Sequence, residues 1–265
     1  MRRLVSYALV AILALSGCTA SASQSPKAKP RSATGAGAEA GGGRQGGKAG
    51  QPERAPVVMV LGDSYTAGID ATPPEATYAA ETARRLGWQI IIAGHRGTGF
   101  VAPGRIGKSF SMLYEEELAW RPAPDMVMVV GGHNDWGHDP LLVEAYAREL
   151  LTKIRTRWPD AAVVLTGPMW GGDPPPASLR VRDALKGVAS ELGLPFIDPL
   201  GERWITGGVR RKSGNARLYI RRDGIHPNPA GNRYFADRLV ADLRRLGLDR
   251  PHPPKGRPAA SAQGQ

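Results

Sequence analysis

Short apolar runs rich in β-branched residues alternate with longer amphipathic segments over most of the chain, and this alternation restricts the folds it can adopt. The runs that predict strands are 57–61, 89–93, 126–130, 161–166 and 194–197. The segments that predict helices are 77–86, 141–157, 177–192 and 230–246. The first run is apolar at every position, which is typical of a parallel strand buried on both faces. Strand–helix alternation therefore predicts an α/β fold, with helices on both faces of a mostly parallel, five-stranded sheet.

Composition divides the 265 residues into a folded domain and flexible flanks. Residues 19–55 contain almost no large apolar side chain and are rich in Ser, Ala, Gly, Lys and Pro, and the end of the chain is similarly polar. Such segments cannot bury enough apolar area to offset the entropy that is lost on ordering. We therefore expect four parts, namely a signal peptide at 1–17, a disordered linker at 18–55, one folded domain at 56–249 and a disordered tail at 250–265.

The net charge of +11 lies mainly in these flanks, because residues 56–249 carry only +2. Basic flexible flanks favour an anionic surface such as a membrane or a cell wall. No nucleic-acid recognition motif accompanies the charge, so we expect no nucleic-acid partner.

The first residues have the pattern of an export signal. Two arginines precede an apolar stretch at 4–15, which is shorter than the span of about 20 residues that crosses a membrane. The sequence 15–18, Leu-Ser-Gly-Cys, resembles the lipobox of bacterial lipoproteins. Cys18 is the only cysteine, so no internal disulfide can form. We expect Cys18 to be lipidated and to anchor the protein to the outer face of a bacterial cell membrane; the alternative is plain secretion with an incidental cysteine.

Polar, glycine-containing segments follow the first three predicted strands. In parallel sheets, ligands bind at the carboxyl ends of the strands, where these segments would lie. The first segment places Ser64 on a turn from which its hydroxyl can project into the crevice, although a turn before a helix uses the same residues. The second, 94–99, is either a flexible loop or a phosphate cradle, but it lacks the glycine order of a dinucleotide site. In the third, Asn134 either approaches a ligand or, like Asp135, caps a turn.

A fourth segment, just before the last predicted helix, contains Asp223 and His226. The three-residue spacing lets the carboxylate reach the imidazole when the chain turns, and Gly224 makes that turn easy. His95, His133 and His138 are rival bases, and of these only His138 has an acid three residues before it. No histidine pair has helical zinc spacing, so we expect no metal site.

Together these blocks resemble a known family. Gly62-Asp63-Ser64, Gly97, Gly132-x-Asn134-Asp135 and Asp223-x-x-His226 are similar to the Ser, Gly, Asn and His blocks of the SGNH/GDSL hydrolases, in the family's order, within 57–245. The resemblance implies a flavodoxin-like, three-layer α/β/α fold and a serine esterase that needs no cofactor. It implies that Ser64 is the nucleophile, His226 the general base and acid, and Asp223 the group that orients the imidazole.

The same resemblance implies an oxyanion hole made by the N–H groups of Ser64 and Gly97 and the side-chain amide of Asn134. The block around Gly97 lacks the upstream asparagine that many members carry, which leaves Gly94 and Gly99 as alternatives.

The substrate is constrained less tightly. The chain has no large insertion that could form a lid. This favours short acyl groups as substrates, above all acetyl esters on carbohydrate or on cell-envelope glycans. We expect the protein to act as a monomer. A lipase, phospholipase or thioesterase is the alternative within the fold, and a catalytically silent, surface-anchored binding domain is the alternative from another class. Trp136, Met169 and Trp170 either line the pocket or pack in loops.

Basic residues cluster just before Asp223. They are Arg210, Arg211, Lys212, Arg217, Arg221 and Arg222. Our hypothesis is that they form a basic rim that favours anionic substrates; the alternative is an ordinary solvated surface.

Overall fold

Five parallel strands form the central sheet of residues 54–252, the part of the chain that this computed structural model describes. They are β1 (Val57–Gly62), β2 (Gln89–Gly94), β3 (Met126–Val130), β4 (Ala162–Thr166) and β5 (Phe196–Ile197). Their order in the sheet is β2-β1-β3-β4-β5, and every neighbouring pair is parallel. This is the flavodoxin-like order, so the predicted parallel sheet is confirmed.

The four predicted helices form, and several short helical segments accompany them. The helices are α1 (Ser64–Ala67), α2 (Tyr78–Leu86), α3 (Phe110–Leu113), α4 (Pro140–Arg157), α5 (Pro176–Glu191), α6 (Ala216–Tyr219) and α7 (Pro229–Arg245). A 3₁₀ turn, η1 (Pro74–Ala76), precedes α2, and a π-helical segment, η2 (Tyr114–Leu118), continues α3. The short helices have too few residues to produce an amphipathic period, so the sequence pattern does not reveal them.

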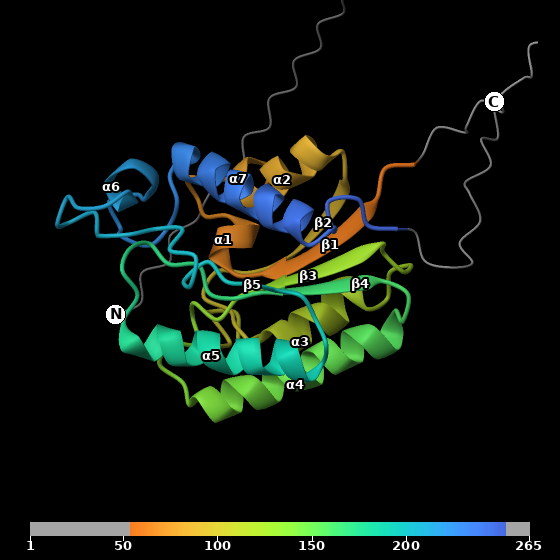
Figure 1. Ribbon diagram of the computed structural model, residues 1–265. Coiled ribbons are helices and arrows are strands. Elements are labelled where there is room, and N and C mark those ends of the chain that lie inside the picture. The colour runs from red at the N-terminus through yellow and green to blue at the C-terminus, as the bar shows by residue number, and fades with distance from the viewer. Residues whose placement is uncertain (1–53, 253–265) are drawn as a thin grey trace, which may run out of the picture. The chain divides into compact units, whose positions relative to one another are not determined.

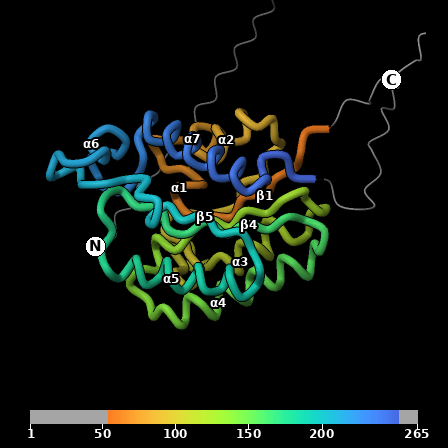
Figure 2. Tube along the Cα trace, in the orientation of Figure 1, coloured from red at the N-terminus to blue at the C-terminus, as the bar shows by residue number. Residues whose placement is uncertain are grey.

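Helices cover both faces of the sheet, which gives three layers (Figures 1 and 2). Helices α2 and α7 lie on one face, and α3, α4 and α5 lie on the other. Successive residues of a strand point to opposite faces. Accordingly, Val58 and Val60 of β1 join the core beneath α2 and α7, whereas Met59 and Leu61 join the core beneath α4 and α5. Burial on both faces is why this strand is apolar at every position.

Helix ends follow the signals in the sequence. The side chain of Asp139 accepts a hydrogen bond from the N–H of Leu141 and caps α4, whose first residue is a proline. Asn228 caps α7 in the same way. Gly87 ends α2 in the left-handed conformation with φ 70°, as its position after the predicted helix suggested.

The start of the sheet is held by a buried carboxylate. Asp125 is only 1% exposed and pairs with Arg54 at 2.5 Å. It also accepts the N–H of Val57 at 2.6 Å. A paired and hydrogen-bonded charge of this kind is tolerated in the interior. Arg54, the first described residue, is therefore already tied to the domain.

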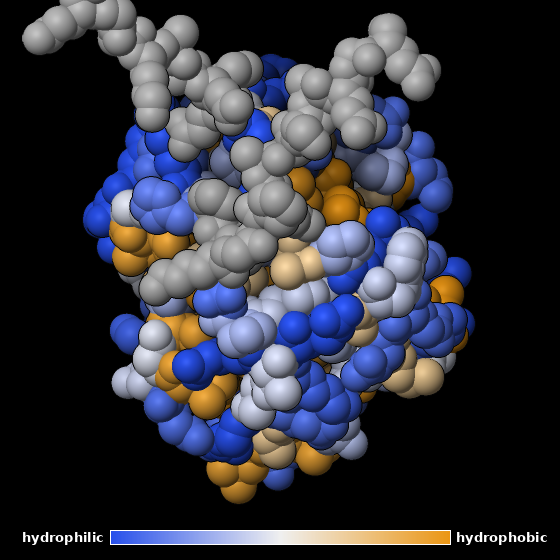
Figure 3. All heavy atoms as spheres, turned by 90° about the vertical axis from the view of Figure 1, so that its right-hand side faces the viewer, coloured by the Kyte–Doolittle hydropathy of each residue, from blue (hydrophilic) through white to orange (hydrophobic). Residues whose placement is uncertain are grey.

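The surface seen in Figure 3 is mostly hydrophilic, and hydrophobic residues lie on it in separate patches. Among the helices within residues 54–252, none combines the length and the hydropathy that crossing a bilayer requires.

Candidate active site

The register of the sheet brings the predicted polar segments together. Gly62, the last residue of β1, lies opposite Gly94 of β2 and Val130 of β3. The chain segments that follow these three strands therefore leave the sheet side by side. A Cβ atom on Gly94 would lie 1.9 Å from the carbonyl oxygen of Gly62. Gly94 is thus required for the close approach of the two strands.

Ser64 begins helix α1 immediately after β1. Asp63 caps this helix, because its Oδ1 accepts the N–H of Tyr65 at 2.9 Å. No acceptor for the N–H of Ser64 is present among the described residues, as expected for the first turn of a helix. The backbone thus leaves one donor of Ser64 available beside its hydroxyl.

Three of the predicted side chains form a continuous hydrogen-bonded chain. The Nε2 atom of His226 lies 2.9 Å from Ser64 Oγ, and its Nδ1 atom lies 2.8 Å from Asp223 Oδ2. A carboxylate only accepts hydrogen bonds, so Nδ1 carries the ring proton and Nε2 accepts the hydroxyl of Ser64. The sequence separation of Ser64 and His226 is 162 residues, which the fold closes to hydrogen-bonding distance.

The carboxylate of Asp223 is held in its charged form. Burial raises its pKa, but hydrogen bonds from the N–H groups of Ile225 and His226 and from the His226 ring outweigh burial and lower the pKa below its ordinary value. A carboxylate that stays ionised can stabilise positive charge on the imidazole of His226.

Tyr65 joins the helix of Ser64 to the loop of His226. Its hydroxyl donates a hydrogen bond to the carbonyl oxygen of Ile225 at 2.6 Å, and its ring lies 5.7 Å from that of His226. The sequence analysis missed this residue, because its partner lies 160 positions away. Its position next to Ser64 was the only signal.

The backbone of Gly97 is exposed to the same cavity. Gly97 has φ 79° and lines, with Ser64, His226 and Asn134, a cavity of about 410 Å³. Within the described part of the chain its N–H has no acceptor, whereas the N–H of Gly99 donates to Ala102 at 2.8 Å. Of the three glycine alternatives, Gly97 is therefore the one whose donor is both free and at the cavity.

Asn134 lies in the wall of this cavity. Its Nδ2 donates to the carbonyl oxygen of Thr98 at 2.9 Å and more weakly to Asp63 Oδ2 at 3.4 Å. The amide is thereby anchored between the segments that follow β1 and β2. The longer bond leaves one N–H that a stronger acceptor in the cavity could take over.

Asp135 has a role that the sequence analysis did not find. Its buried side chain accepts the N–H groups of Phe100, Val101 and Ala102 at 2.9–3.0 Å. A Cβ atom on Gly99 would lie 2.4 Å from its carboxylate. Asp135 therefore anchors the loop that carries Gly97, and its side chain does not act as a turn cap.

Replacing Asp135 with alanine is expected to destabilise the domain by about 3 kcal/mol or more, because three backbone donors lose their acceptor and each unpaired buried group costs about 1–3 kcal/mol. Urea denaturation measures this loss. Asp139→Ala is the control, since it removes an exposed helix cap worth about 1 kcal/mol. Equal losses for the two variants would contradict the anchoring role.

Asp63 is the other buried carboxyl at the site. Burial raises its pKa to about 7, with a further contribution from the charge of Asp135, and the hydrogen bond from the N–H of Tyr65 opposes this rise. Asp63 therefore changes its protonation near neutral pH.

Asp63→Asn is expected to become more stable relative to the unchanged protein as pH rises from about 4 to about 7. An unfolded aspartate has a pKa of about 3.9, so in this window the folded state binds the extra proton. The free energy of unfolding that Asp63 contributes must therefore fall as pH rises, by up to about 4 kcal/mol in total. Urea denaturation of both proteins across this window measures how the difference between their free energies of unfolding changes with pH. A difference that stays constant would contradict the prediction.

The rival histidines are placed differently. Burial lowers the pKa of His133 to about 4, and its Nδ1 donates to the carbonyl oxygen of Met169 at 3.0 Å. His133 is therefore a neutral part of the cavity wall, with its ring 4.3 Å from that of Trp170. His95 also lines the cavity and lies 4.0 Å from Glu117. The hydrogen bond to Ser64 Oγ comes from His226.

The sequence suggested three further pocket residues, Trp136, Met169 and Trp170, but none of them lines this cavity. Trp136 is half exposed, and Met169 is buried and supports His133 through its carbonyl oxygen. Trp170 stands behind His133. Met169 and Trp170 therefore contact the cavity wall through His133.

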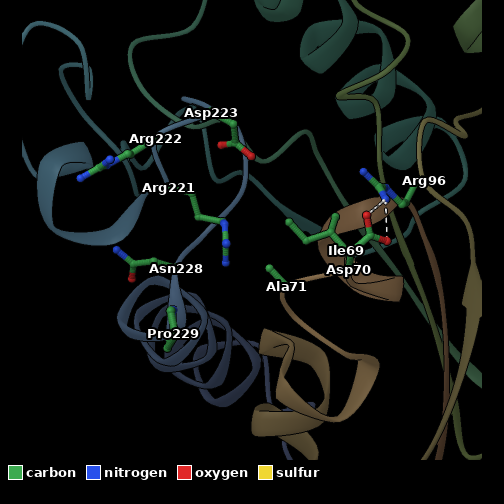
Figure 4. A pocket seen from close by; sticks show the side chains of 9 residues that line it. All are labelled: Ile69, Asp70, Ala71, Arg96, Arg221, Arg222, Asp223, Asn228 and Pro229. Atoms are coloured by element: carbon green, nitrogen blue, oxygen red, sulfur yellow. Dashed lines mark hydrogen bonds and ion pairs between the residues drawn. The ribbon is translucent and has the colours of Figure 1, made fainter.

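The basic cluster divides between two places. Arg221 and Arg222 border a second cavity of about 610 Å³ that Asp223 also lines (Figure 4). Arg210 and Arg211 lie beside Asp173 at another surface hollow. Asp223 lines both hollows, so the two pairs of arginines lie around it. Cys18, the remaining predicted site residue, lies outside the described residues.

A family model and several known proteins match this chain. Residues 60–234 match the model of the GDSL-like lipase/acylhydrolase family. The GDSL lipase Rv0518 of Mycobacterium tuberculosis is 32% identical over 197 residues, which cover 69% of this chain and 79% of that protein. The fold is similar to that of a family two carbohydrate esterase from Clostridium thermocellum in complex with cellohexaose, with a TM-score of 0.57 and 19% identity over 74% of this chain and 66% of that one. It is also similar to Est24, a carbohydrate acetylesterase from Sinorhizobium meliloti, with a TM-score of 0.55 and 19% identity over 72% of this chain and 99% of that one.

Proposed function

This chain belongs to the GDSL-like lipase/acylhydrolase family, and we propose that it is an extracytoplasmic serine esterase that removes short acyl groups, above all acetyl, from carbohydrate or cell-envelope glycans. The observation that carries the proposal is the chain of hydrogen bonds from Ser64 Oγ through His226 to Asp223. A hydroxyl is a poor nucleophile until a neighbouring base removes its proton, and this arrangement supplies that base.

The first half of the reaction forms an acyl-enzyme. Ser64 Oγ attacks the ester carbonyl carbon while His226 Nε2 takes its proton, and Asp223 stabilises the imidazolium that results. The carbonyl oxygen becomes an oxyanion, which accepts hydrogen bonds from the N–H groups of Ser64 and Gly97 and from the amide of Asn134. As the carbon–oxygen bond breaks, His226 returns the proton to the leaving alcohol.

The second half releases the acid. Water replaces the alcohol, and His226 takes a proton from it as it attacks the acyl carbon. The oxyanion forms again at the same donors, and collapse of this intermediate breaks the bond to Ser64 Oγ. The proton held by His226 then returns to Ser64.

The shape and lining of the site support short acyl groups. The cavity of about 410 Å³ is lined by polar groups, and Ile106 and Ile225 are its aliphatic side chains. A long acyl chain would gain little apolar burial there. The carbohydrate esterases of similar fold support a glycan as the alcohol partner. The relative from Mycobacterium tuberculosis is named a lipase, so lipase activity is the second candidate function.

A series of p-nitrophenyl esters from acetate to palmitate tests the proposal. We expect kcat/KM to be at least about tenfold higher for acetate than for palmitate, because Ile106 and Ile225 alone offer too little apolar surface to bind a long acyl chain. A preference for palmitate would favour the lipase. No hydrolysis of any ester, together with no labelling of Ser64 by a fluorophosphonate, would favour a binding domain and end the esterase proposal.

The location of the enzyme is part of the same proposal. The signal peptide (1–17), the lipidated Cys18, most of the linker (18–55) and most of the tail (250–265) lie outside the described residues. The lipobox-like sequence supports the signal peptide and the lipidation of Cys18. We infer a monomer tethered to the outer face of the cell membrane. Cys18→Ser should move the protein from the membrane fraction to the soluble fraction, whereas Thr19→Ser should not; unchanged partition of Cys18→Ser would contradict the anchor.

A further inference from the structure

A second cavity opens beside the proposed catalytic residues. It has a volume of about 610 Å³, and Asp223, Arg221 and Arg96 border it. Arg96 also lines the cavity that contains Ser64. The two cavities are therefore neighbours on the carboxyl edge of the sheet, and a substrate held in one can extend into the other.

Arg221 is fixed relative to His226. Its N–H donates to the carbonyl oxygen of His226 at 2.9 Å, and its own carbonyl oxygen accepts the N–H of Gly224 at 3.0 Å. These bonds close the loop that carries Asp223 and His226. The backbone from which the side chain of Arg221 projects is consequently held beside the proposed catalytic base.

The guanidinium of Arg221 has no carboxylate partner within residues 54–252. Its side chain extends across the cavity towards Ala71 (Figure 4), and its one hydrogen bond is a long contact of 3.5 Å with the hydroxyl of Thr72. Arg222, next in the sequence, points away from the other labelled side chains in the same view. Arg221 therefore reaches into the cavity, whereas Arg222 stands at its border.

Arg96 approaches from the other side of the cavity, on the segment after β2 (Figure 4). Its Nη1 lies 3.0 Å from both carboxylate oxygens of Asp70. The side chain of Asp70 is 93% exposed, so this ion pair is solvent-screened and easily exchanged. Arg96 can therefore turn to another anion in the cavity.

The lining of the cavity keeps a net positive charge. It contains three arginines, Arg96, Arg221 and Arg222, against the two carboxylates of Asp70 and Asp223. Asn228 and Pro229, at the N-terminus of the 17-residue helix α7, also border the cavity. The positive end of a helix dipole adds to the attraction for an anion.

We propose that this cavity is a subsite for an anionic oxygen group, a carboxylate or a phosphate, carried by the ester substrate and bound by Arg221 and Arg96. The inference rests on the proposed esterase function and narrows its substrate class. Guanidinium groups match carboxylate and phosphate geometry, and a positively charged cleft raises the local concentration of an anionic substrate.

Two pairs of matched esters test the subsite with the full-length protein. Mono-p-nitrophenyl succinate against p-nitrophenyl acetate places the charge on the acyl side, and acetyl glycerol phosphate against triacetin places it on the alcohol side. At low ionic strength kcat/KM should be about tenfold higher for the charged member of at least one pair. The advantage should shrink as NaCl is raised to about 0.5 M, because salt screens the attraction. No advantage in either pair would overturn the inference.

Three substitutions test whether Arg221 and Arg96 bind the anionic group. Arg221→Gln should lower the ratio of charged to neutral kcat/KM by about tenfold, and Asp70→Asn should raise it by about twofold because it frees Arg96. Arg217→Gln, which removes the same charge from α6 outside the lining of this cavity, should change the ratio by less than about twofold. Equal effects of the two arginine substitutions, or no rise with Asp70→Asn, would overturn the subsite. If the unchanged protein hydrolyses none of the four esters, this would instead refute the proposed esterase function.

Discussion

Ser64→Ala is expected to lower kcat/KM for p-nitrophenyl acetate by about 10⁴-fold or more, the effect of removing the nucleophile from a triad. The substitution should leave the fold intact, because the side chain of Ser64 makes its hydrogen bond to His226 and to no other described group. The thermal midpoint and the circular dichroism spectrum of the variant should therefore match those of the unchanged protein, so the lost rate would report chemistry alone.

An exposed serine provides the control for this experiment. Ser190→Ala, near the end of α5, changes the same atoms far from the cavity and should retain the full rate. Residual hydrolysis by Ser64→Ala must also be insensitive to fluorophosphonate. Equal rates for Ser64→Ala and the unchanged protein would refute a serine mechanism, whatever the geometry around His226.

The elements that the sequence predicted are those whose own residues determine them. The strand Met126–Val130 is apolar at every position because both its faces are buried, and no other element explains such a run. Helix α7 could be predicted from its apolar repeat and from the Asn228-Pro229 pair at its start. In contrast, α1 and α6 have four residues each and form because neighbouring loops hold their ends, so local sequence carries no period for them.

The candidate site divides in the same way. Ser64, Asp223 and His226 could be proposed from sequence because each stands at the end of an element that the rules place at one edge of the sheet. The supports of the site could not. Asp135 binds three N–H groups more than 30 positions away, and Tyr65 binds a carbonyl oxygen 160 positions away. Both contacts depend on the distance between loops, which only the folded chain defines.

The choice among Gly94, Gly97 and Gly99 shows what geometry adds. All three are glycines in one loop, and no pattern separates them. In the structure Gly94 is required by strand contact, and Gly99 by the carboxylate of Asp135. Gly97 remains with a free N–H at the cavity, which supports its proposed role as an oxyanion donor.

Asn134→Ala is expected to lower kcat for p-nitrophenyl acetate by about 10²–10³-fold, since the loss of one oxyanion donor costs about 2.7–4 kcal/mol in the transition state. KM should change little, because the amide is occupied by Thr98 and Asp63 in the resting site and is needed only when negative charge develops. Asn134→Asp tests the same donor at nearly constant volume. It should be at least as slow, because it replaces an N–H by a second carboxyl beside Asp63.

The amide of Asn134 also holds the loop at Thr98, so a structural effect must be separated from a chemical one. KM and the stability of Asn134→Ala make the separation, because an oxyanion donor acts in the transition state and not on the bound substrate. An amide that acts only on the oxyanion should lower kcat while KM and the urea midpoint of Asn134→Ala stay near those of the unchanged protein. If KM rises and the urea midpoint falls together with kcat, Asn134 acts through the loop and the proposed oxyanion hole loses its side-chain donor.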